Sequence, residues 1–504
     1  MQILPRSAPR RALRSSSNVS PASLSYGSYY NPSPRAPFVC FSCRRSRPQP
    51  GVLQQPRRSF SATVSRRSSS SSSSSPPLAE ALSKGYAELK SRRLISVAGR
   101  DAPRFLQGIL TASIAADPAH GRNGRSSAAA ARNVVEAHQA RADAFYGGVL
   151  NAMGRVLHDV FVYPETRGLY GGGGGGAAFV VEVDAAQLEN LMRHMRRYKL
   201  RSVVDLRALP PDEAAVWQVW GQDPPPPPPP PFLPSESSPH VVLRDPRAPE
   251  MGFRVLKFQV SSSSSSSGMV DEAVYRARRY LLGVPEGQAE IPPSQALPLE
   301  ANMDLMGGID FRKGCYIGQE LTIRTRHRGV VRKRVLPCML YNYTSSSSSS
   351  SSSTTTSQQP PQHLEYKPGP LPISGDVGQE GKGEGEGEGE GKERALSAED
   401  IPAGLSIGRV GKKGRSAGTW IAGVGNIGLA LCRLNVMTDV ELPGEPVSAS
   451  ADPFDPATHE FVMHLDGADA DADGGERGRS VRVKAFVPDW LRERLSGGGG
   501  GGGG

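Results

Sequence analysis

Acidic residues are missing from the first 79 positions of this 504-residue chain, which hold twelve arginines and no lysine. A leader that is rich in Arg and Ser and free of Asp and Glu is typical of a mitochondrial transit peptide. Arg58-Ser59-Phe60, followed by Ser61, resembles a cleavage context of the matrix protease. We therefore expect a transit peptide over residues 1–60, a Ser-rich disordered linker over 61–77, and a mature protein in the mitochondrial matrix. The alternative is a disordered basic arm on a cytosolic protein.

The rest of the chain lacks a basic surplus. The formal charge of +11 comes from 60 Lys and Arg against 49 Asp and Glu, and twelve of those arginines lie in the leader. The remaining 48 basic residues face 49 acidic ones, which leaves a net charge of about −1. A nucleic-acid binder needs its positive charge on the folded domain, where it neutralises phosphates. We therefore expect no nucleic-acid partner.

Long apolar runs and a cysteine framework are also absent. No apolar run approaches the roughly 18 residues that span a bilayer, which predicts a soluble product with no membrane partner. Five cysteines do not make a disulfide framework in a chain of this size. Cys40 and Cys43 lie in the expected leader, where no second pair completes a zinc site. Of the others, Cys338 and Cys432 lie in apolar stretches and are expected in the core, which leaves Cys315.

Homopolymer runs interrupt the chain at many points. They carry no apolar side chains to offset the entropy lost on ordering, so we expect them to be disordered insertions. The longest insertion is expected near residues 344–397. A Gly tail is expected over residues 496–504. The remaining length suffices for one sizeable core and a smaller second one. The runs are Ser68–Ser75, Gly171–Gly176, Pro224–Pro231, Ser261–Ser267, Ser345–Ser353 and Gly497–Gly504.

Hydrophobic periodicity between the runs predicts an α+β fold. Period-2 stretches predict strands, and Asp101-Ala102-Pro103 opens a helix, since Pro fits its first turn. A helix after Asp184 carries an apolar stripe at 188, 191, 192 and 195, with arginines 193, 196 and 197 on the solvated side. Short strands with Gly-rich turns near the C-terminus predict a small barrel or sandwich. The strands are expected at 94–97, 149–150, 156–162, 179–183, 202–206, 215–220, 241–243, 253–260, 332–343, 405–410, 420–424, 427–434 and 481–487.

The most informative segment is Lys313-Gly314-Cys315-Tyr316-Ile317-Gly318-Gln319-Glu320. A thiolate at Cys315 would be a soft iron ligand or a redox-sensitive nucleophile, and Lys313 could lower its pKa. Gly314 and Gly318 free the backbone on either side. Gln319 and Glu320 could hydrogen-bond a polar heterocycle or hold the loop in shape. The competing interpretation makes Cys315 a small buried residue beside a turn.

A second segment lies just upstream and adds two carboxylates and an amide. It is Leu297-Pro298-Leu299-Glu300-Ala301-Asn302-Met303-Asp304. Together the two segments resemble the folate-binding family related to the T-protein of the glycine cleavage system, and within it the mitochondrial iron–sulfur cluster assembly branch. The resemblance implies a T-protein-like folate-binding domain of mixed sheets and helices over 78–335 and a C-terminal β-barrel over 336–495.

The resemblance also implies ligands and site residues. Cys315 would be the functional thiol and a metal ligand shared with a partner, because one remaining non-core cysteine cannot hold a cluster alone. Tetrahydrofolate and a transient iron–sulfur cluster are the implied cofactors. Glu300, Asn302 and Asp304 would lie near the folate, although Glu300 and Asp304 equally suit turn caps. The remaining implied binding residues are Lys313, Gly314, Tyr316, Gly318, Gln319 and Glu320.

The implied function is maturation of [4Fe–4S] proteins by a non-enzymatic factor. Its partners would be A-type iron–sulfur scaffold proteins and the recipient [4Fe–4S] enzymes. A folate-dependent aminomethyl or one-carbon transferase and a passive interaction protein remain as alternatives. Where aminomethyltransferases carry two adjacent acids, this chain has His158-Asp159, so Asp159 is the candidate base only if the protein is a transferase. His158 is expected on a strand surface.

Overall fold

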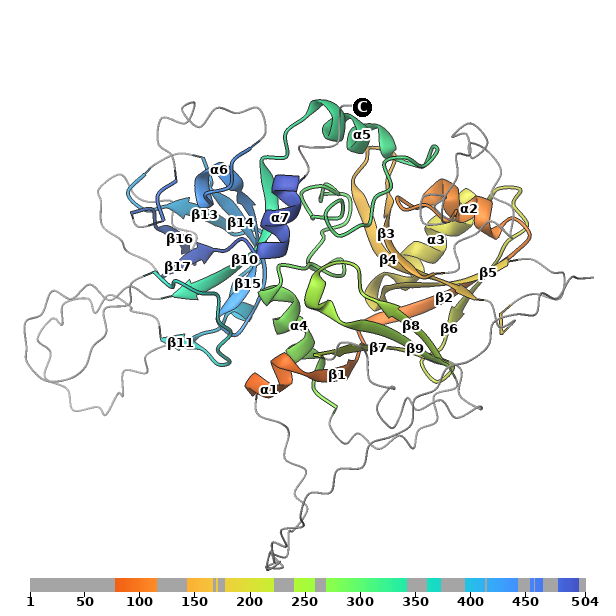
Figure 1. Ribbon diagram of the computed structural model, residues 1–504, viewed down its shortest axis with the longest axis horizontal. Helices are drawn as coiled ribbons and strands as arrows, with labels where there is room; N and C mark the ends of the chain where they lie inside the picture. Colours follow the sequence, from red (N-terminus) through yellow and green to blue (C-terminus); the bar gives the residue numbers. More distant parts are fainter. Residues whose placement is uncertain are drawn as a thin grey trace, which may run out of the picture. The chain divides into compact units, whose positions relative to one another are not determined.

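The computed structural model describes one compact unit, which lies within residues 71–504. Each element below belongs to this unit, and Figure 1 shows them in chain order from red to blue. The described residues are 78–115, 143–165, 169–170, 177–221, 240–258, 269–341, 360–372, 395–412, 415–442, 454–456, 458–465 and 479–497. The predicted transit peptide, the Ser-rich linker and the homopolymer runs lie outside these residues, apart from the first glycine of the C-terminal run.

A five-stranded antiparallel sheet has the order β3-β4-β5-β2-β6. Helices α2 and α3 pack against one face of this sheet, where their apolar side chains join those of the strands. On α3 the predicted stripe buries Leu191, Met192 and Met195, while the three arginines are exposed. The bounds are β2 Arg92–Gly99, α2 Ala102–Ile109, β3 Phe145–Leu150, β4 Val156–Glu165, β5 Ala177–Asp184, α3 Leu188–Lys199 and β6 Asp205–Leu209, with a short 3₁₀ turn at Ala185–Gln187.

A four-stranded antiparallel sheet has the order β1-β7-β9-β8. Its core is continuous with the second face of the five-stranded sheet, because side chains of β4 and β7 belong to one buried cluster. The sheet is followed by α4 and, after a segment with little regular structure, by α5. The bounds are α1 Leu78–Ser83, β1 Gly85–Glu88, β7 Ala214–Trp220, β8 His240–Arg244, β9 Phe253–Phe258, α4 Glu272–Leu281 and α5 Gln319–Arg328, with a 3₁₀ turn at Pro249–Met251.

The C-terminal strands close into a barrel in the order β10-β15-β14-β13-β16-β17. The α+β class and the C-terminal barrel are therefore confirmed, and the sandwich alternative is wrong. Helix α7 follows the barrel, and its Trp490 Nε1 donates to Leu282 O at 2.9 Å, just after α4. The bounds are β10 Lys333–Tyr341, β13 Ser406–Arg409, β14 Gly418–Val424, β15 Ile427–Arg433, α6 Leu434–Met437, β16 Phe461–His464, β17 Ser480–Ala485 and α7 Asp489–Gly497.

Three expectations need correction. Strand β6 begins at Asp205 instead of residue 202, because Lys199–Ser202 forms a turn closed by Ser202 N–H donating to Lys199 O. Strands β1 and β16 were not expected. Part of the expected disordered insertion over 344–397 is ordered: β11, Leu371–Pro372, pairs with β12, Ala395–Leu396. The segment before β11 is also fixed, since Asn426 Oδ1 accepts from Lys367 N–H at 2.6 Å and Asn426 Nδ2 donates to Glu365 O at 3.0 Å.

Candidate functional site

Cys315 is exposed on the loop that precedes α5. The interpretation of Cys315 as a small buried residue is therefore wrong. The other two described cysteines, Cys338 and Cys432, are fully buried in the barrel, as expected, with their sulfur atoms 3.8 Å apart. Cys315 is thus the solvent-accessible thiol of the part of the chain that the structure describes.

Lys313 anchors this loop to the end of α2. Its ammonium group donates to Gln107 O at 2.8 Å, Leu110 O at 2.6 Å and Ala112 O at 3.2 Å. Burial lowers the pKa of Lys313 to about 7, although nearby Asp310 opposes the shift. These hydrogen bonds point the ammonium at carbonyls in and just after the last turn of α2, so Lys313 holds the loop in place instead of pairing with the thiol.

The residues on the other side of Cys315 hold the loop through its backbone. Gln319 Oε1 accepts from Tyr316 N–H at 3.2 Å, and Ile317 N–H donates to Gly108 O at 3.1 Å. The Tyr316 ring is buried, with the Lys313 ammonium 4.9 Å from its centroid. Gln319 therefore shapes the loop, one of the two roles expected for it, while Gly314 beside the thiol is exposed. The thiol thus lies on an exposed loop whose flanks are fixed.

Gly318 caps α5 with φ +78°, a conformation that favours glycine. A Cβ at this position would lie 2.2 Å from Asn151 O, in the turn between β3 and β4. This turn and α5 lie together in Figure 1. The expected freedom of the backbone at Gly318 therefore serves a tight contact with the hairpin.

Glu300 lies in a cavity of 220 Å³ between the 297–300 segment and α5. Burial raises the pKa of Glu300, although Lys333 and Arg155 oppose the shift. Leu321 and Thr322 of α5 form part of the same cavity wall. The structure thus brings Glu300 close to α5, whereas Glu320 on the first turn of α5 is exposed.

Asn302 and Asp304 tie their segment to the first barrel strand. Asn302 Nδ2 donates to Val335 O at 2.7 Å, and Arg334 donates to Asn302 Oδ1 at 3.3 Å. Arg334 also donates to both oxygens of Asp304, at 2.9 and 3.0 Å. Because Asn302 is fully buried and both side chains are used in this way, they hold β10 in position.

Asp159 is fully buried on β4 and is paired. Arg92 lies 3.4 Å from its carboxylate, and the Gly287 N–H and Gln288 Nε2 donate to it at 3.2 Å. A cation and two further donors thus hold the Asp159 carboxylate inside the protein. Its neighbour His158 is 3% exposed, so the expectation of a surface histidine is wrong.

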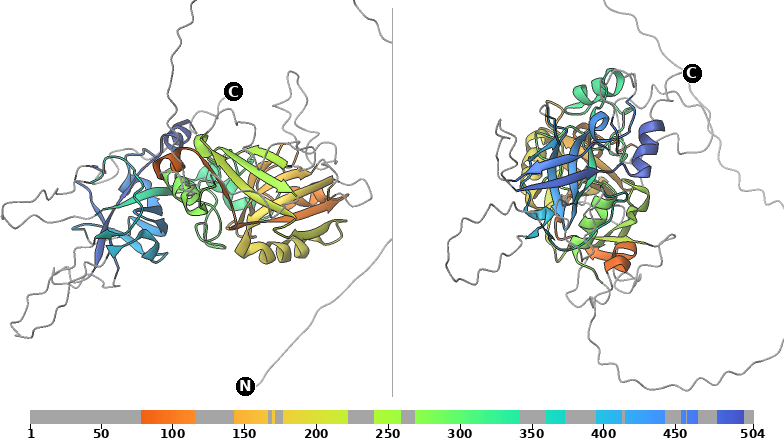
Figure 2. Two further views of the ribbon diagram at one scale, coloured as in Figure 1. Left: turned by 90° about the horizontal axis from the view of Figure 1, so that it is seen from below. Right: turned by 90° about the vertical axis from the view of Figure 1, so that its left-hand side faces the viewer.

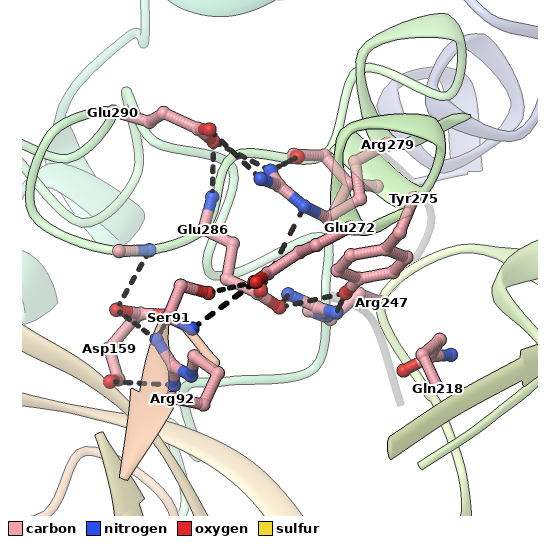
Figure 3. A network of polar contacts seen from close by, with 12 residues as sticks. Ser91, Arg92, Asp159, Gln218, Arg247, Glu272, Tyr275, Arg279, Glu286 and Glu290 are labelled. Atoms are coloured by element: carbon pink, nitrogen blue, oxygen red, sulfur yellow. Dashed lines mark hydrogen bonds and ion pairs between the residues drawn. The ribbon is translucent and has the colours of Figure 1, made fainter. Parts of the chain in front are cut away.

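Asp159 belongs to a buried network of ionic side chains, shown in Figure 3. At its centre, Glu286 Oε2 accepts from Arg247 at 2.6 Å, Arg254 at 2.5 Å and the Tyr275 hydroxyl at 2.9 Å. Burial alone would raise the pKa of Glu286, but Arg254 and Arg247 outweigh it and hold the pKa well below its usual range. Such a network is costly to break, because a lost partner leaves a buried charge uncompensated.

A cavity of 490 Å³ adjoins this network. The pair of Arg279 and Glu290, with contacts of 2.6 and 2.9 Å, lies in its wall. We did not assign a role to these residues from the sequence. The available signal was the presence of charges inside predicted strands and helices, as at Arg254 in β9 and Arg279 in α4, where side chains are normally apolar or exposed. The cavity is lined by Glu88, Lys90, Ser91, Arg92, Asp184, Met269, Val270, Asp271, Glu272, Ala273, Tyr275, Arg276, Arg279, Glu286, Gly287, Ala289 and Glu290.

The described residues contain neither a cluster of metal ligands nor a membrane-spanning helix. Within them, no group of three or more His, Cys, Asp or Glu side chains is arranged to hold a metal ion. None of the helices in the same residues is both long and apolar enough to cross a membrane.

The chain is similar to known proteins along most of its length. Residues 394–493 match the family described as "CAF17, C-terminal beta-barrel domain". The "Iron-sulfur cluster assembly factor IBA57 homolog, mitochondrial" of Chaetomium globosum is 43% identical over 463 residues, which cover 91% of this chain and 94% of the relative. The chain belongs to the IBA57 family. The predicted membership is confirmed, and so is a mitochondrial location.

Other IBA57 family members show the same relationship. The homologue of Pyricularia oryzae is 43% identical, with 82% of this chain and 86% of the relative covered. The homologue of Neurospora crassa is 40% identical, with 91% of this chain and 88% of the relative covered. Among solved structures, the glycine cleavage system aminomethyltransferase T from Bartonella henselae matches with a TM-score of 0.46 at 13% identity, over 82% of this chain and 87% of that one.

Proposed function

We propose that this protein assembles [4Fe–4S] clusters on recipient enzymes in the mitochondrial matrix, and that Cys315 supplies one thiolate to a cluster whose other ligands belong to a partner. The exposure of Cys315 on an anchored loop carries this proposal. An iron–sulfur cluster needs about four protein ligands, predominantly Cys. Because Cys338 and Cys432 are buried in the barrel, the remaining ligands must come from another chain. An A-type scaffold protein that carries a [2Fe–2S] cluster is the proposed partner.

The family name supports a role in iron–sulfur cluster assembly, and the loop geometry supports the role of the thiol. A thiol that serves only packing is buried, as Cys338 and Cys432 are, whereas Cys315 faces solvent with Lys313 and Gln319 holding the chain on either side. Fixed flanks limit the conformational entropy that the loop loses when the thiol binds a cluster.

The test combines chemistry and growth. Anaerobic mixing of the mature protein with a [2Fe–2S]-loaded A-type scaffold should yield a complex or a converted cluster, seen by gel filtration and visible spectroscopy. The Cys315→Ser variant should not convert the cluster, while a Cys338→Ser variant that still folds serves as the matched thiol control. In a strain that lacks the protein, full rescue of aconitase- and lipoate-dependent growth by Cys315→Ala would contradict the assigned role.

For tetrahydrofolate, we propose the 490 Å³ cavity instead of the Asn302 segment. Asn302 and Asp304 use their polar atoms on Arg334 and Val335, so they do not fit a folate contact. The cavity instead offers the carboxylate of Asp184, each oxygen of which accepts one backbone N–H and keeps a further acceptor position, beside Glu272 and Tyr275 of α4. These groups suit a flat heterocycle with N–H donors, and the volume lies in the range of about 300–1,000 Å³ found for small-molecule sites.

A thermal-shift titration tests this site. A stable reduced folate should raise the melting temperature of the wild type. Ala273→Trp, which fills the cavity from the first turn of α4, should abolish the shift. Ala277→Val on the same helix lies outside the cavity lining and serves as the control. A shift that persists undiminished in Ala273→Trp would place the folate elsewhere.

A further inference from the structure

Half of the residues of helix α5 are exposed to solvent. Thr322 is the one fully buried residue among the ten residues of α5. The N-cap residue of the helix is Gly318, which has no side chain with which to cap it. Figure 2 shows α5 at the edge of the described fold. A ten-residue helix is marginal by itself, and helices in proteins normally gain their stability from a packed apolar face. The exposed face of α5 is therefore a candidate interaction surface.

The cavity that contains Glu300 opens beside α5. Its walls are mainly apolar: Leu297 and Leu299 on one side, Leu321 on the helix, and Val330 and Val331 after it. At 220 Å³ it is smaller than the roughly 300–1,000 Å³ of small-molecule sites. Val330 is 38% exposed at the end of this stretch. A cavity of this size and lining suits one large apolar side chain, which is how interface anchors are usually bound.

The surroundings of the cavity are basic. Arg324, Arg326 and Arg328 are exposed on α5, and Arg332, Lys333 and Arg433 lie in the cavity lining. Two carboxylates oppose them, Glu300 in the cavity and Glu320 on the first turn of α5. The local surplus contrasts with the net charge of about −1 outside the leader. Charge complementarity therefore selects an acidic partner surface.

The surface is also close to the thiol. Cys315 precedes α5 by four residues, and a ten-residue helix is about 15 Å long. A standard interface buries about 800 Å² on each partner, a patch roughly 16 Å in radius. One such footprint therefore spans the cavity, the basic face of α5 and Cys315.

We propose that the cavity beside α5 is an anchor site, into which an acidic protein that carries an iron–sulfur cluster inserts one apolar side chain, so that its cluster faces Cys315. The choice of partner rests on the proposed function, whereas the docking itself does not require Cys315 chemistry. Affinity comes from the anchor and the basic face, and the thiol acts after docking. The cluster-free partner therefore also binds this surface, and the thiolate of Cys315 adds affinity for the loaded partner.

The test measures binding of a purified A-type scaffold protein, both cluster-free and [2Fe–2S]-loaded, by calorimetry under anaerobic conditions. Val330→Asp, which places a carboxylate at the apolar cavity, should weaken both forms at least tenfold. The double variant Arg324→Glu with Arg328→Glu should weaken both by a similar factor and flatten the salt dependence of Kd. A matched charge reversal on α3, Arg193→Glu with Arg196→Glu, should stay within twofold of the wild type. Circular dichroism and the melting temperature verify that each variant folds.

The outcomes separate docking from chemistry. Weaker binding in the α5 variants, with an unchanged Kd of the cluster-free partner for Cys315→Ser, supports the anchor site, even if Cys315 later proves dispensable for cluster conversion. Unchanged binding in both α5 variants, or no binding of either scaffold form to the wild type, overturns it. A homodimer that dissociates in Val330→Asp would make a second copy of this chain the occupant and also overturn the proposal.

Discussion

Gly154 and Gly318 lie back to back where the β3–β4 turn meets the N-terminus of α5. A Cβ on Gly318 would come within 3.1 Å of the Gly154 Cα, and one on Gly154 within 2.9 Å of the Gly318 carbonyl oxygen. Both residues have positive φ, +79° and +78° respectively. This contact fixes the N-terminus of α5, which follows the Cys315 loop, against the β3–β4 turn, because nothing larger than hydrogen fits between the two backbones.

We expect Gly318→Ala to lower the free energy of unfolding by about 2–3 kcal/mol, because it adds positive-φ strain and a clash with Asn151 O. Gly307→Ala is the matched control: its φ is +73°, but nothing lies within 4 Å of the added Cβ, so strain alone should cost about 1 kcal/mol. Urea unfolding of both variants measures the difference. Equal losses would show that the contact with the hairpin is not tight.

Thiol accessibility should differ sharply among the three cysteines beyond the expected leader. In a mature protein that begins at Ser61, a thiol reagent should titrate one group under native conditions and three after denaturation. The hydrogen bond with Cys432, together with burial, raises the pKa of the Cys338 thiol, which slows its reaction further. Cys315→Ser should abolish the fast native reaction. Rapid native labelling of Cys338 or Cys432 would contradict the closed barrel interior.

His158 should make the protein sensitive to acid. Burial, opposed in part by Asp159, lowers the pKa of His158 to about 4 from the ordinary 6.5. Between these values the unfolded chain binds a proton that the folded chain does not, so stability falls as pH drops from 6.5 to 4. The full loss is about 3 kcal/mol. Urea unfolding across this range should show a slope that His158→Gln reduces.

The half-buried His194 provides the comparison for this prediction. Burial also lowers its pKa, with Arg197 adding to the shift, but it is less enclosed than His158. His194→Gln should therefore change the slope of stability against pH less than His158→Gln does. An identical slope in the wild type and in His158→Gln would mean that His158 titrates normally.

Leu200 should be replaceable with a gain in stability. It follows α3 with φ +46° and ψ −112°, a conformation that favours glycine, and its side chain is 85% exposed. Leu200→Gly removes the strain and loses little packing, so we expect a gain of about 1 kcal/mol in the free energy of unfolding. Arg201→Gly, at the next position of the same turn and without a positive φ, should destabilise slightly. Thermal unfolding ranks the three proteins.

Local patterns were enough to predict most elements. The helix opened by Asp101 and Pro103, the β3–β4 hairpin and the apolar stripe of α3 all form as expected, because each depends on residues close in sequence. The exposed segment around Cys315 was also recognisable, since a dense run of chemically active residues does not follow a core pattern. The same logic separated Cys315 from Cys338 and Cys432, which lie among apolar residues.

The environment of β4 could not be read in this way. Val160 and Val162 face the layer with α2 and α3, whereas Phe161 and Tyr163 face the core shared with the four-stranded sheet. Because both faces of the strand are covered, His158 is buried where a one-sided sheet would expose it. Whether His158 is buried therefore depends on the packing of layers against both faces of the sheet.

The sequence by itself determined the periodicity of the strands and helices, the family motif and the isolation of one thiol outside the apolar stretches, because these depend on short-range order along the chain. The tertiary structure decided which charges are buried together. Arg247 and Glu286 are 39 positions apart, and their 2.6 Å contact exists only because the turn after β8 and the segment after α4 converge. It also decided that Asn302 and Asp304 hold β10 while Cys315 remains open to solvent. Such pairings depend on long-range packing, which brings distant backbones together and excludes water, and no local pattern encodes that geometry.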